Sequence, residues 1–261
     1  AWMRRSWRSC VSRQLNKGLT RARTLLCCGA SLLGMSAQHA IGAQDAPLPS
    51  AFVAKFAIEW HGITAGYSQL ELTRSAPNTY TYRSRNLARG IFRLAFPDAI
   101  SQVSEFVLVE GEVRPSSYHA DDGSRDSGKS VDLKFDWQAR RATGSAANKS
   151  VDIALASGTQ DPLSVQIALM CELSAGRTPK SFWLVDNTEI KEYRYVPEGA
   201  VSLDTPLGKL ATVIYRSERT GSDRLTRLWL APALGYLPVR AERSRAGKID
   251  FALSIRELTM H

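Results

Sequence analysis

The string most suggestive of chemistry runs from Gly123 to Ser130 and reads GSRDSGKS. It satisfies the pattern G-x-x-x-x-G-K-S/T of the P-loop, in which backbone amides cradle phosphates, a lysine reaches them and a hydroxyl binds Mg²⁺. The four defining positions are held by Gly123, Gly128, Lys129 and Ser130. Taken alone, the string would indicate a nucleotide-binding site.

The residues around this string argue against nucleotide binding. A P-loop requires a helix that begins at the Gly-Lys-Ser step, because the helix N-terminus helps to hold the phosphates. Here Ser130 leads into VDLKFDW, where apolar and polar residues alternate as in a strand. Three carboxylates, on Asp121, Asp122 and Asp126, would also repel phosphate. We therefore predict a polar hairpin loop over 121–128 and interpret the P-loop match as coincidental.

Other catalytic and metal-binding patterns are scarce in the chain. Beyond residue 43 the histidines are His61, His119 and His261 only. The sequence contains no H-E-x-x-H, C-x-x-C or G-x-S-x-G motif. The loop aspartates do not follow the spacing of a calcium-binding EF-hand. We expect no catalytic residue, no metal and no cofactor, although a triad assembled in space would leave no local sequence pattern.

The aromatic residues form a second class of candidate site. Trp60, Tyr67, Trp137, Tyr193 and Trp229 all lie in or beside stretches that alternate like strands. Core packing accounts for most aromatic residues in such positions, but aromatic side chains also line pockets for apolar ligands. We therefore take these five as candidate lining residues of a lumen that binds an apolar or amphipathic ligand.

The elements that must position these residues are mainly β-strands. In 131–137, four apolar residues alternate with three charged ones, which puts one face in a core and the other in water. The same period of two recurs over 52–60, 67–73, 103–109, 191–196, 210–215, 225–231, 237–243 and 251–258. We expect about ten to thirteen strands joined by short turns. Strongly twisted open sheets rarely exceed about ten strands. We therefore predict a curled antiparallel sheet that forms either a barrel or a half-barrel; the sequence does not decide between the two.

One segment breaks the strand period. Asp161 is a favourable N-cap residue, and Pro162 follows it at the first helical position. The stretch 163–173 is apolar on nearly every side, and Gly176 favours a helix end. We predict one buried or lid helix near 162–175, set inside or over the sheet.

The basic excess of the chain belongs to its N-terminal segment. The 261 residues carry a formal net charge of +9, with 34 basic and 25 acidic side chains. Residues 1–43 hold seven basic and no acidic residues, which leaves 27 basic against 25 acidic and a balance of +2. A basic region, an apolar stretch over 24–35 and small residues follow in the order of a secretory leader. We predict a leader over 1–43, a single β-barrel-like domain over 44–261, and a periplasmic location.

The composition of residues 44–261 restricts the kinds of partner that we expect. A balance of +2 argues against a nucleic-acid partner. After removal of the leader, no stretch approaches the roughly 20 apolar residues that a transmembrane helix needs. Cys171 is the one cysteine beyond residue 43, so we expect no intramolecular disulfide and a buried thiol. We expect a lipid or another amphipathic envelope ligand, or an envelope protein, as the partner.

Several strings of this chain look familiar together. They are FDW at 135–137, DPLS at 161–164, LDTPLG at 203–208 and the segment WLAPALGYLPVR at 229–240. With the leader and the early pair Gly62 and Gly66, they resemble the domain of unknown function 3108 family of bacterial exported proteins. The resemblance covers most of 50–258 and rests on turn, cap and strand residues. It implies a periplasmic β-rich protein of no established activity, so no residue role follows from it.

Three functions are consistent with these observations. The leading hypothesis is a non-catalytic periplasmic barrel that binds an apolar or amphipathic envelope component, or a partner protein, in its concave face. This architecture is similar to the curled sheet and helical lid of lipoprotein-carrier proteins, an analogy of fold alone. The alternatives are an envelope hydrolase acting on glycan or lipid, and a structural or assembly factor of the envelope.

Overall fold

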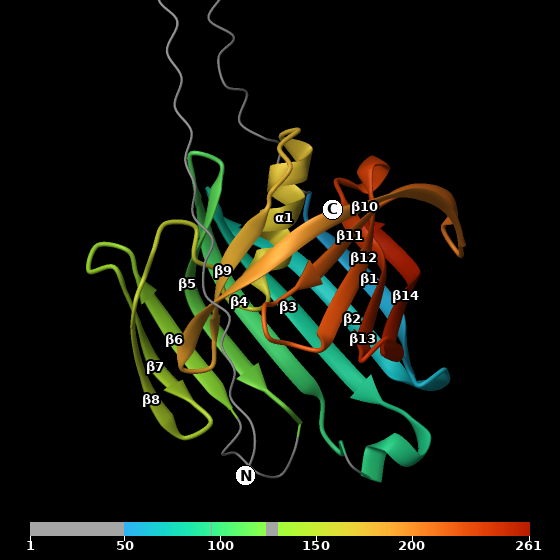
Figure 1. Ribbon diagram of the computed structural model, residues 1–261, viewed down its shortest axis with the longest axis horizontal. Helices are drawn as coiled ribbons and strands as arrows, with labels where there is room; N and C mark the ends of the chain where they lie inside the picture. The colour runs from blue at the N-terminus through green and yellow to red at the C-terminus, as the bar shows by residue number, and fades with distance from the viewer. Residues whose placement is uncertain (1–49, 95, 124–129) are drawn as a thin grey trace, which may run out of the picture. The chain divides into compact units, whose positions relative to one another are not determined.

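The computed structural model describes residues 50–94, 96–123 and 130–261, which belong to one compact unit. The predicted leader over 1–43 lies outside these residues, as do Gly128 and Lys129 of the P-loop-like string. The described residues are mainly β, as predicted, and form one antiparallel sheet with a single α-helix (Figure 1). Within the described residues, no helix is both long and apolar enough to span a bilayer.

Fourteen strands make up the sheet, one more than the upper end of the expected range. They are β1 (Phe52–Trp60), β2 (Ile63–Ala76), β3 (Thr79–Ala88), β4 (Ile100–Val109), β5 (Glu112–Asp121), β6 (Val131–Asp136), β7 (Arg141–Ala146), β8 (Lys149–Ala154), β9 (Ser181–Asp186), β10 (Glu189–Thr205), β11 (Gly208–Glu218), β12 (Arg224–Ala231), β13 (Leu237–Arg245) and β14 (Lys248–Met260). Two short 3₁₀ helices, η1 (Gly90–Leu94) and η3 (Pro232–Leu234), lie in connections.

The strand order places the two ends of the described chain at the centre of the sheet. The order is β8-β7-β6-β5-β4-β3-β2-β1-β14-β13-β12-β11-β10-β9, so every pair of adjacent strands in the sheet except one is consecutive along the chain. The exception is the central pair, in which Phe52 of β1 lies opposite Met260 of β14. The sheet edges are therefore β8 and β9, and the chain passes from one to the other through α1 (Ser164–Ser174).

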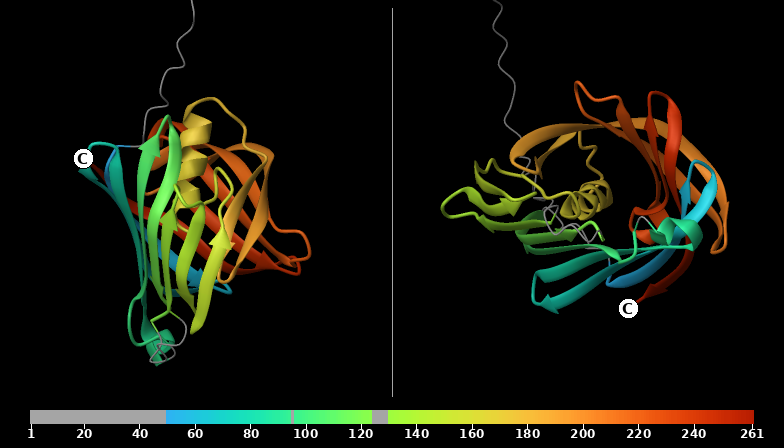
Figure 2. Two further views of the ribbon diagram at one scale, coloured as in Figure 1. Left: turned by 90° about the vertical axis from the view of Figure 1, so that its left-hand side faces the viewer. Right: turned by 90° about the horizontal axis from the view of Figure 1, so that it is seen from below.

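The predicted helix is α1, which begins two residues after the predicted proline position. Oδ1 of Asp161 accepts hydrogen bonds from the backbone N–H groups of Leu163 and Ser164, both at 2.8 Å. The helix itself begins at Ser164, with Leu163 at the N-cap, so the predicted cap at Asp161 lies two residues too early and Pro162 precedes the helix. Asp161 instead holds the turn that leads into the helix. Eight of the eleven helical residues are buried, which accords with a buried helix, and Figure 2 shows α1 inside the curve of the sheet.

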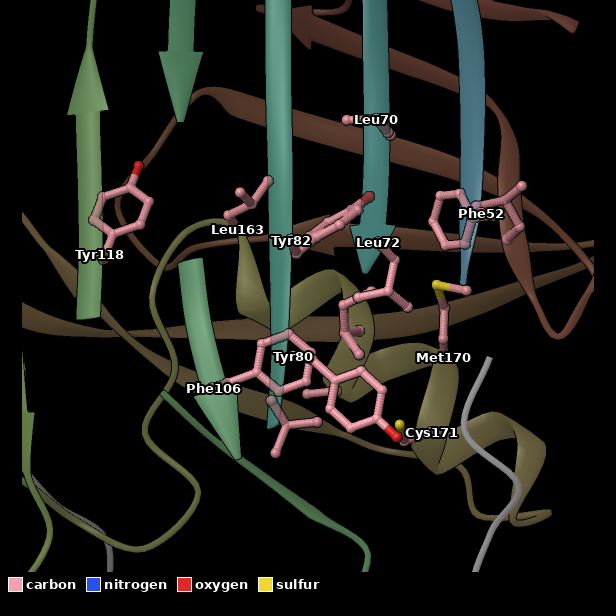
Figure 3. Close-up of a cluster of buried hydrophobic side chains, with 14 of the residues drawn as sticks. Phe52, Leu70, Leu72, Tyr80, Tyr82, Phe106, Tyr118, Leu163, Met170 and Cys171 are labelled. Atoms are coloured by element: carbon pink, nitrogen blue, oxygen red, sulfur yellow. The ribbon is translucent and has the colours of Figure 1, made fainter. Parts of the chain in front are cut away.

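Two hydrophobic clusters hold α1 against the concave face of the sheet. On one side, Ile167, Met170 and Cys171 pack with residues of β1 to β5, among them Leu72 and Phe106 (Figure 3). On the other side, the helix packs on β9 to β12 through a second cluster. Its buried members are Val165, Leu169, Leu173, Leu184, Tyr195, Tyr215 and Leu230. Packing on two faces explains why the helix sequence is apolar nearly all round.

The sheet does not close into a complete barrel. The connection before α1 occupies the gap between its edges, where Gln160 forms an isolated parallel bridge with Leu184 of β9. The side-chain Nε2 of Gln160 donates to the carbonyl oxygen of Val113 on β5, at 2.8 Å. One fully buried residue thus joins strands that lie on opposite sides of the gap.

Candidate ligand-binding cavity

An apolar cavity of about 500 Å³ lies at the end of the sheet opposite α1. Its walls come from β1, β2, β3, β4, β13 and β14 and from η1. The lining residues are Ile58, Trp60, Ala65, Asn86, Leu87, Ala88, Phe92, Phe96, Ile100, Arg243 and Phe251. Pockets for small ligands typically have volumes of roughly 300–1,000 Å³ and mainly apolar walls. This cavity meets both criteria.

The strand register brings the main walls of the cavity together. Trp60 at the end of β1 lies opposite Phe251 of β14, and Phe251 lies opposite Arg243 of β13. Directly paired residues of antiparallel strands share a face, so these three side chains lie side by side on one face. Ile58 shares this face because it is two residues from Trp60 along β1.

The connection from β3 to β4 forms the remaining wall. The backbone N–H of Arg89 donates to the carbonyl oxygen of Ala65 at 2.7 Å, which holds the start of η1 against β2. The N–H of Phe96 donates to the carbonyl oxygen of Phe92 at 3.0 Å, and both residues line the cavity. At Gly66, a Cβ would lie 2.0 Å from the carbonyl oxygen of Leu87, so this close approach of β2 and β3 requires glycine.

Arg243 is the charged residue among those that line the cavity. Its Nε lies 3.2 Å from Oδ1 of Asp250, and its guanidinium lies 5.3 Å from the centre of the Phe251 ring. The aromatic ring and the carboxylate hold the guanidinium in place, and its charge is partly balanced. The cavity thus combines an apolar interior with one positioned cation and the amide of Asn86.

Only one of the five predicted aromatic residues lines this cavity. Trp60 forms part of its wall and is 41% exposed. Tyr67 lies on the opposite face of β2 from the core residues Leu70 and Leu72, since it is an odd number of positions away from them. Its hydroxyl accepts a hydrogen bond from Arg89 at 2.7 Å, and its side chain is exposed. The prediction that Tyr67 faces a lumen is therefore wrong.

The other three aromatic residues lie apart from the cavity. Trp137 donates through Nε1 to the carbonyl oxygen of Pro115, at 2.7 Å, in the turn after β6. Tyr193 packs against the second hydrophobic cluster, between α1 and β9 to β12, and its hydroxyl donates to Oδ2 of Asp186 at 3.2 Å. Its partial burial, reinforced by that carboxylate, raises the pKa of the phenol. Trp229 packs against the core, and the guanidinium of Arg240 lies 5.5 Å from its ring centre.

The sequence pattern does not indicate most of the residues that line the cavity. Phe92 and Phe96 belong to a connection that has no strand period, so alternation gave no reason to select them. The segment GIFRLAFP, which ends at Pro97 and connects two strands, is unusually apolar for a turn, and this composition could have marked both phenylalanines as candidates. Arg243 and Phe251 lie on strands that were predicted, but their pairing depends on register, which one sequence does not reveal.

The described part of the P-loop-like string has strand and turn geometry. Gly123 has φ of +69°, and its N–H donates to Oδ1 of Asp121 at 2.9 Å. At the other end, Ser130 is followed directly by β6, which pairs with β5. The residues that follow Ser130 thus form an antiparallel strand, whereas phosphate binding requires a helix N-terminus there.

A histidine–carboxylate pair lies on exposed positions of β5 and β6. Nδ1 of His119 is 2.6 Å from Oδ1 of Asp132, beside a hollow of about 490 Å³. The hydroxyl of Ser117 also borders this hollow, but it donates to Oε2 of Glu105 at 3.0 Å. A nucleophile would have to be bonded to the imidazole, and no described hydroxyl forms that bond. In the described residues, no cluster of three or more His, Cys, Asp or Glu could hold a metal ion.

The curled fourteen-stranded sheet with an internal helix defines a β-barrel-like protein. The chain belongs to the family described as "Protein of unknown function (DUF3108)", which matches residues 55–251. No curated protein matches the chain.

One solved structure shows the same fold at low sequence identity. The chain is similar to a β-barrel-like protein of domain of unknown function DUF1849 from Brucella abortus, with a TM-score of 0.55 and 12% identity. The match covers 82% of this chain and 100% of that one. A weaker similarity, with a TM-score of 0.35 and 8% identity, links it to a "putative exported protein with YmcC-like fold" from Bacteroides fragilis, over 82% of this chain and 97% of that one.

Proposed function

We propose that this protein is a non-catalytic binding protein of the bacterial periplasm, and that it holds an apolar or amphipathic envelope component in the concave face of its sheet. The observation that carries the proposal is the cavity between Trp60, Phe92 and Phe251. The leader-like composition of residues 1–43 supports export.

The distribution of packing supports a ligand at this end of the sheet. Near α1 the concave face is filled by the two hydrophobic clusters, which leave the helix almost fully buried. At the opposite end the cavity has apolar walls, and none of the residues that the structure describes fills it. Exposed apolar surface of this kind is unfavourable in water, and an acyl chain or a similar apolar group would cover it.

Arg243 suggests which kind of amphiphile suits the cavity. Its guanidinium borders the apolar walls and is held by Asp250 and the ring of Phe251. A guanidinium in such a position can donate to a carboxylate or phosphate while the apolar part of the ligand lies against Trp60. The proposed ligand is therefore an amphiphile with an anionic head group.

Native mass spectrometry of gently purified protein, together with titration of a fluorescent fatty acid, tests this proposal. Ala88→Trp adds an indole to the cavity wall, whereas Val201→Trp adds the same group at an exposed position on β10. We expect the first variant to lose the ligand and the second to keep it. Equal binding by both variants, or no binding by the unmodified protein, would contradict the proposal.

A further inference from the structure

Exposed apolar side chains are concentrated at the end of the sheet that carries η1. In the described residues, eleven large apolar side chains are exposed, and seven of them lie near the β1–β2, β3–β4 and β13–β14 connections. These seven are Trp60, Ile63, Leu87, Ile91, Leu94, Phe96 and Ile249. Apolar residues scattered singly over a surface are ordinary, whereas a concentration of them marks contact with another molecule or with lipid.

The most exposed members of this group lie on η1. Ile91 is 77% and Leu94 89% exposed, while Phe92 between them contributes to the cavity wall. Figure 1 shows η1 at the end of the sheet away from α1, beyond the ends of the neighbouring strands. Because Phe92 and the bond from Arg89 to Ala65 hold η1 in place, the two aliphatic side chains are presented on an anchored turn.

Ile63 extends the same surface onto the sheet. It is 63% exposed and lies opposite Trp60, at the point where β1 and β2 join. The N–H of His61 in this turn donates to the carbonyl oxygen of Asp250, which places the β1–β2 turn next to Ile249. We call Ile63, Ile91, Leu94 and Ile249 the apolar rim.

The segments that carry the apolar rim have a positive formal charge. The segments 59–64, 85–100 and 243–250 together hold six basic and three acidic residues, a balance of +3. Since residues 44–261 as a whole carry only +2, the remainder of that region has a balance of −1. Arg243 and Arg245 pair with Asp250 and Asp223. No described acidic residue forms an ion pair with Arg89, Arg93 or Lys248, whose charges are therefore available to a partner.

We propose that the apolar rim and its basic residues dock on a membrane surface that contains anionic phospholipid. Aliphatic side chains on a protruding turn can insert at the boundary of head groups and acyl chains, while the adjacent cations attract the anionic leaflet. A second copy of the chain is a poorer occupant, because an interface between two identical rims would bring the two positive patches together. The inference goes beyond the proposed function and does not require the cavity to hold a ligand.

Flotation with lipid vesicles tests the proposal on the full chain. Vesicles of equal parts phosphatidylglycerol and phosphatidylethanolamine are compared with vesicles of phosphatidylcholine alone. We expect binding to the anionic vesicles, weakened by salt. Ile91→Asp with Leu94→Asp should reduce this binding by about a hundredfold or more, because the transfer of each aliphatic side chain is worth roughly tenfold or more. Arg93→Gln should reduce it by about fivefold and lessen its dependence on salt.

Matched variants separate docking from other effects. Val201 and Met260 are also exposed apolar residues, at 42% and 47%, and lie outside the rim segments, so Val201→Asp with Met260→Asp should bind vesicles normally. Ala88→Trp should also bind vesicles normally, which distinguishes failure of the cavity proposal from failure of this one. Thermal unfolding should be unchanged in the Ile91→Asp, Leu94→Asp variant, since both side chains are exposed.

Three results would overturn the inference. The first is absence of vesicle binding by the unmodified protein. The second is equal loss in the Val201→Asp, Met260→Asp control, which would mean that any added charge matters. The third is a change of oligomeric state, with vesicle binding unaltered, when Ile91 and Leu94 are replaced; analytical ultracentrifugation would then identify the rim as an interface between copies.

Discussion

Replacing Asp161 tests whether a single buried carboxyl fixes α1 in the curve of the sheet. Its Oδ1 accepts from the N–H groups of Leu163 and Ser164, and its Oδ2 accepts from the hydroxyl of Ser104 on β4 at 2.6 Å. The residue is fully buried, so Asp161→Ala would leave three donors without an acceptor away from water. Each buried unsatisfied group costs roughly 1–3 kcal/mol, so we expect a loss of about 4 kcal/mol in the free energy of unfolding.

Asp161→Asn separates hydrogen bonding from charge. The amide oxygen can still accept from both backbone groups, and the amide nitrogen can donate to the hydroxyl oxygen of Ser104. We therefore expect Asp161→Asn to cost about 1 kcal/mol or less at neutral pH. Urea unfolding followed by tryptophan fluorescence measures both variants, and Ser104→Ala is a control that removes one donor.

The pH dependence of the same variants gives a second check. Burial raises the pKa of Asp161 above its ordinary value of 3.8, although hydrogen bonds from Ser104, Ser164 and Leu163 oppose this rise. The folded protein therefore holds the proton more tightly than the unfolded chain. The stabilisation from this group is complete below pH 3.8 and is lost as pH rises through the raised pKa. Relative to the unmodified protein, Asp161→Asn should gain stability over that interval. A cost at neutral pH equal to that of Asp161→Ala would refute this reasoning.

Three further predictions concern packing and reactivity. Gly66→Ala should lower the free energy of unfolding by about 3 kcal/mol or prevent folding, because the added Cβ would meet a carbonyl oxygen of β3. Gly62→Ala has open space around it and should cost about 1 kcal/mol, because the residue has a positive φ. Chemical denaturation measures both variants. Cys171 should not react with a disulfide reagent until the protein unfolds, because burial raises its pKa to about 12; early reaction would contradict the packing of α1. Leu72→Ala should cost about 2–5 kcal/mol and Leu94→Ala about 0.5 kcal/mol or less in the same denaturation assay.

The sheet could be predicted where apolar residues face the core in steps of two. Alternation identified β1, β6 and β12 to β14 nearly within their bounds. It failed at β3, whose inner face carries the buried Ser84, and at β7, whose buried positions are Ala142 and Ala146. Small or polar side chains can occupy a concave face where neighbouring strands supply the bulk, so hydrophobicity along one strand does not reveal them.

The candidate site was less predictable because it depends on register. The alternation along β2 predicts that Tyr67 and Leu70 lie on different faces, but it does not by itself show which face is concave. An extra residue in β2, where Ile58 pairs with Gly66 and Glu59 with Thr64, further complicates the reading near the turn. Trp60 could be predicted because it continues the apolar face of β1, whereas Phe92 lies in a connection without any period.

The central position of the first and last strands has a consequence for how the sheet can assemble. Every strand pair except β1–β14 joins neighbours in sequence, so each half of the sheet can form as a simple meander. The seam between β1 and β14 must wait for the last strand, and until then the edge of β1 stays open to other chains. The N–H of His261 already donates to the carbonyl oxygen of Ala51 at 2.8 Å. A circular permutant could join Ala51 to His261 and open the chain between β8 and α1. The β1–β14 pair would then form as a hairpin, and the new chain ends would lie at the gap in the sheet.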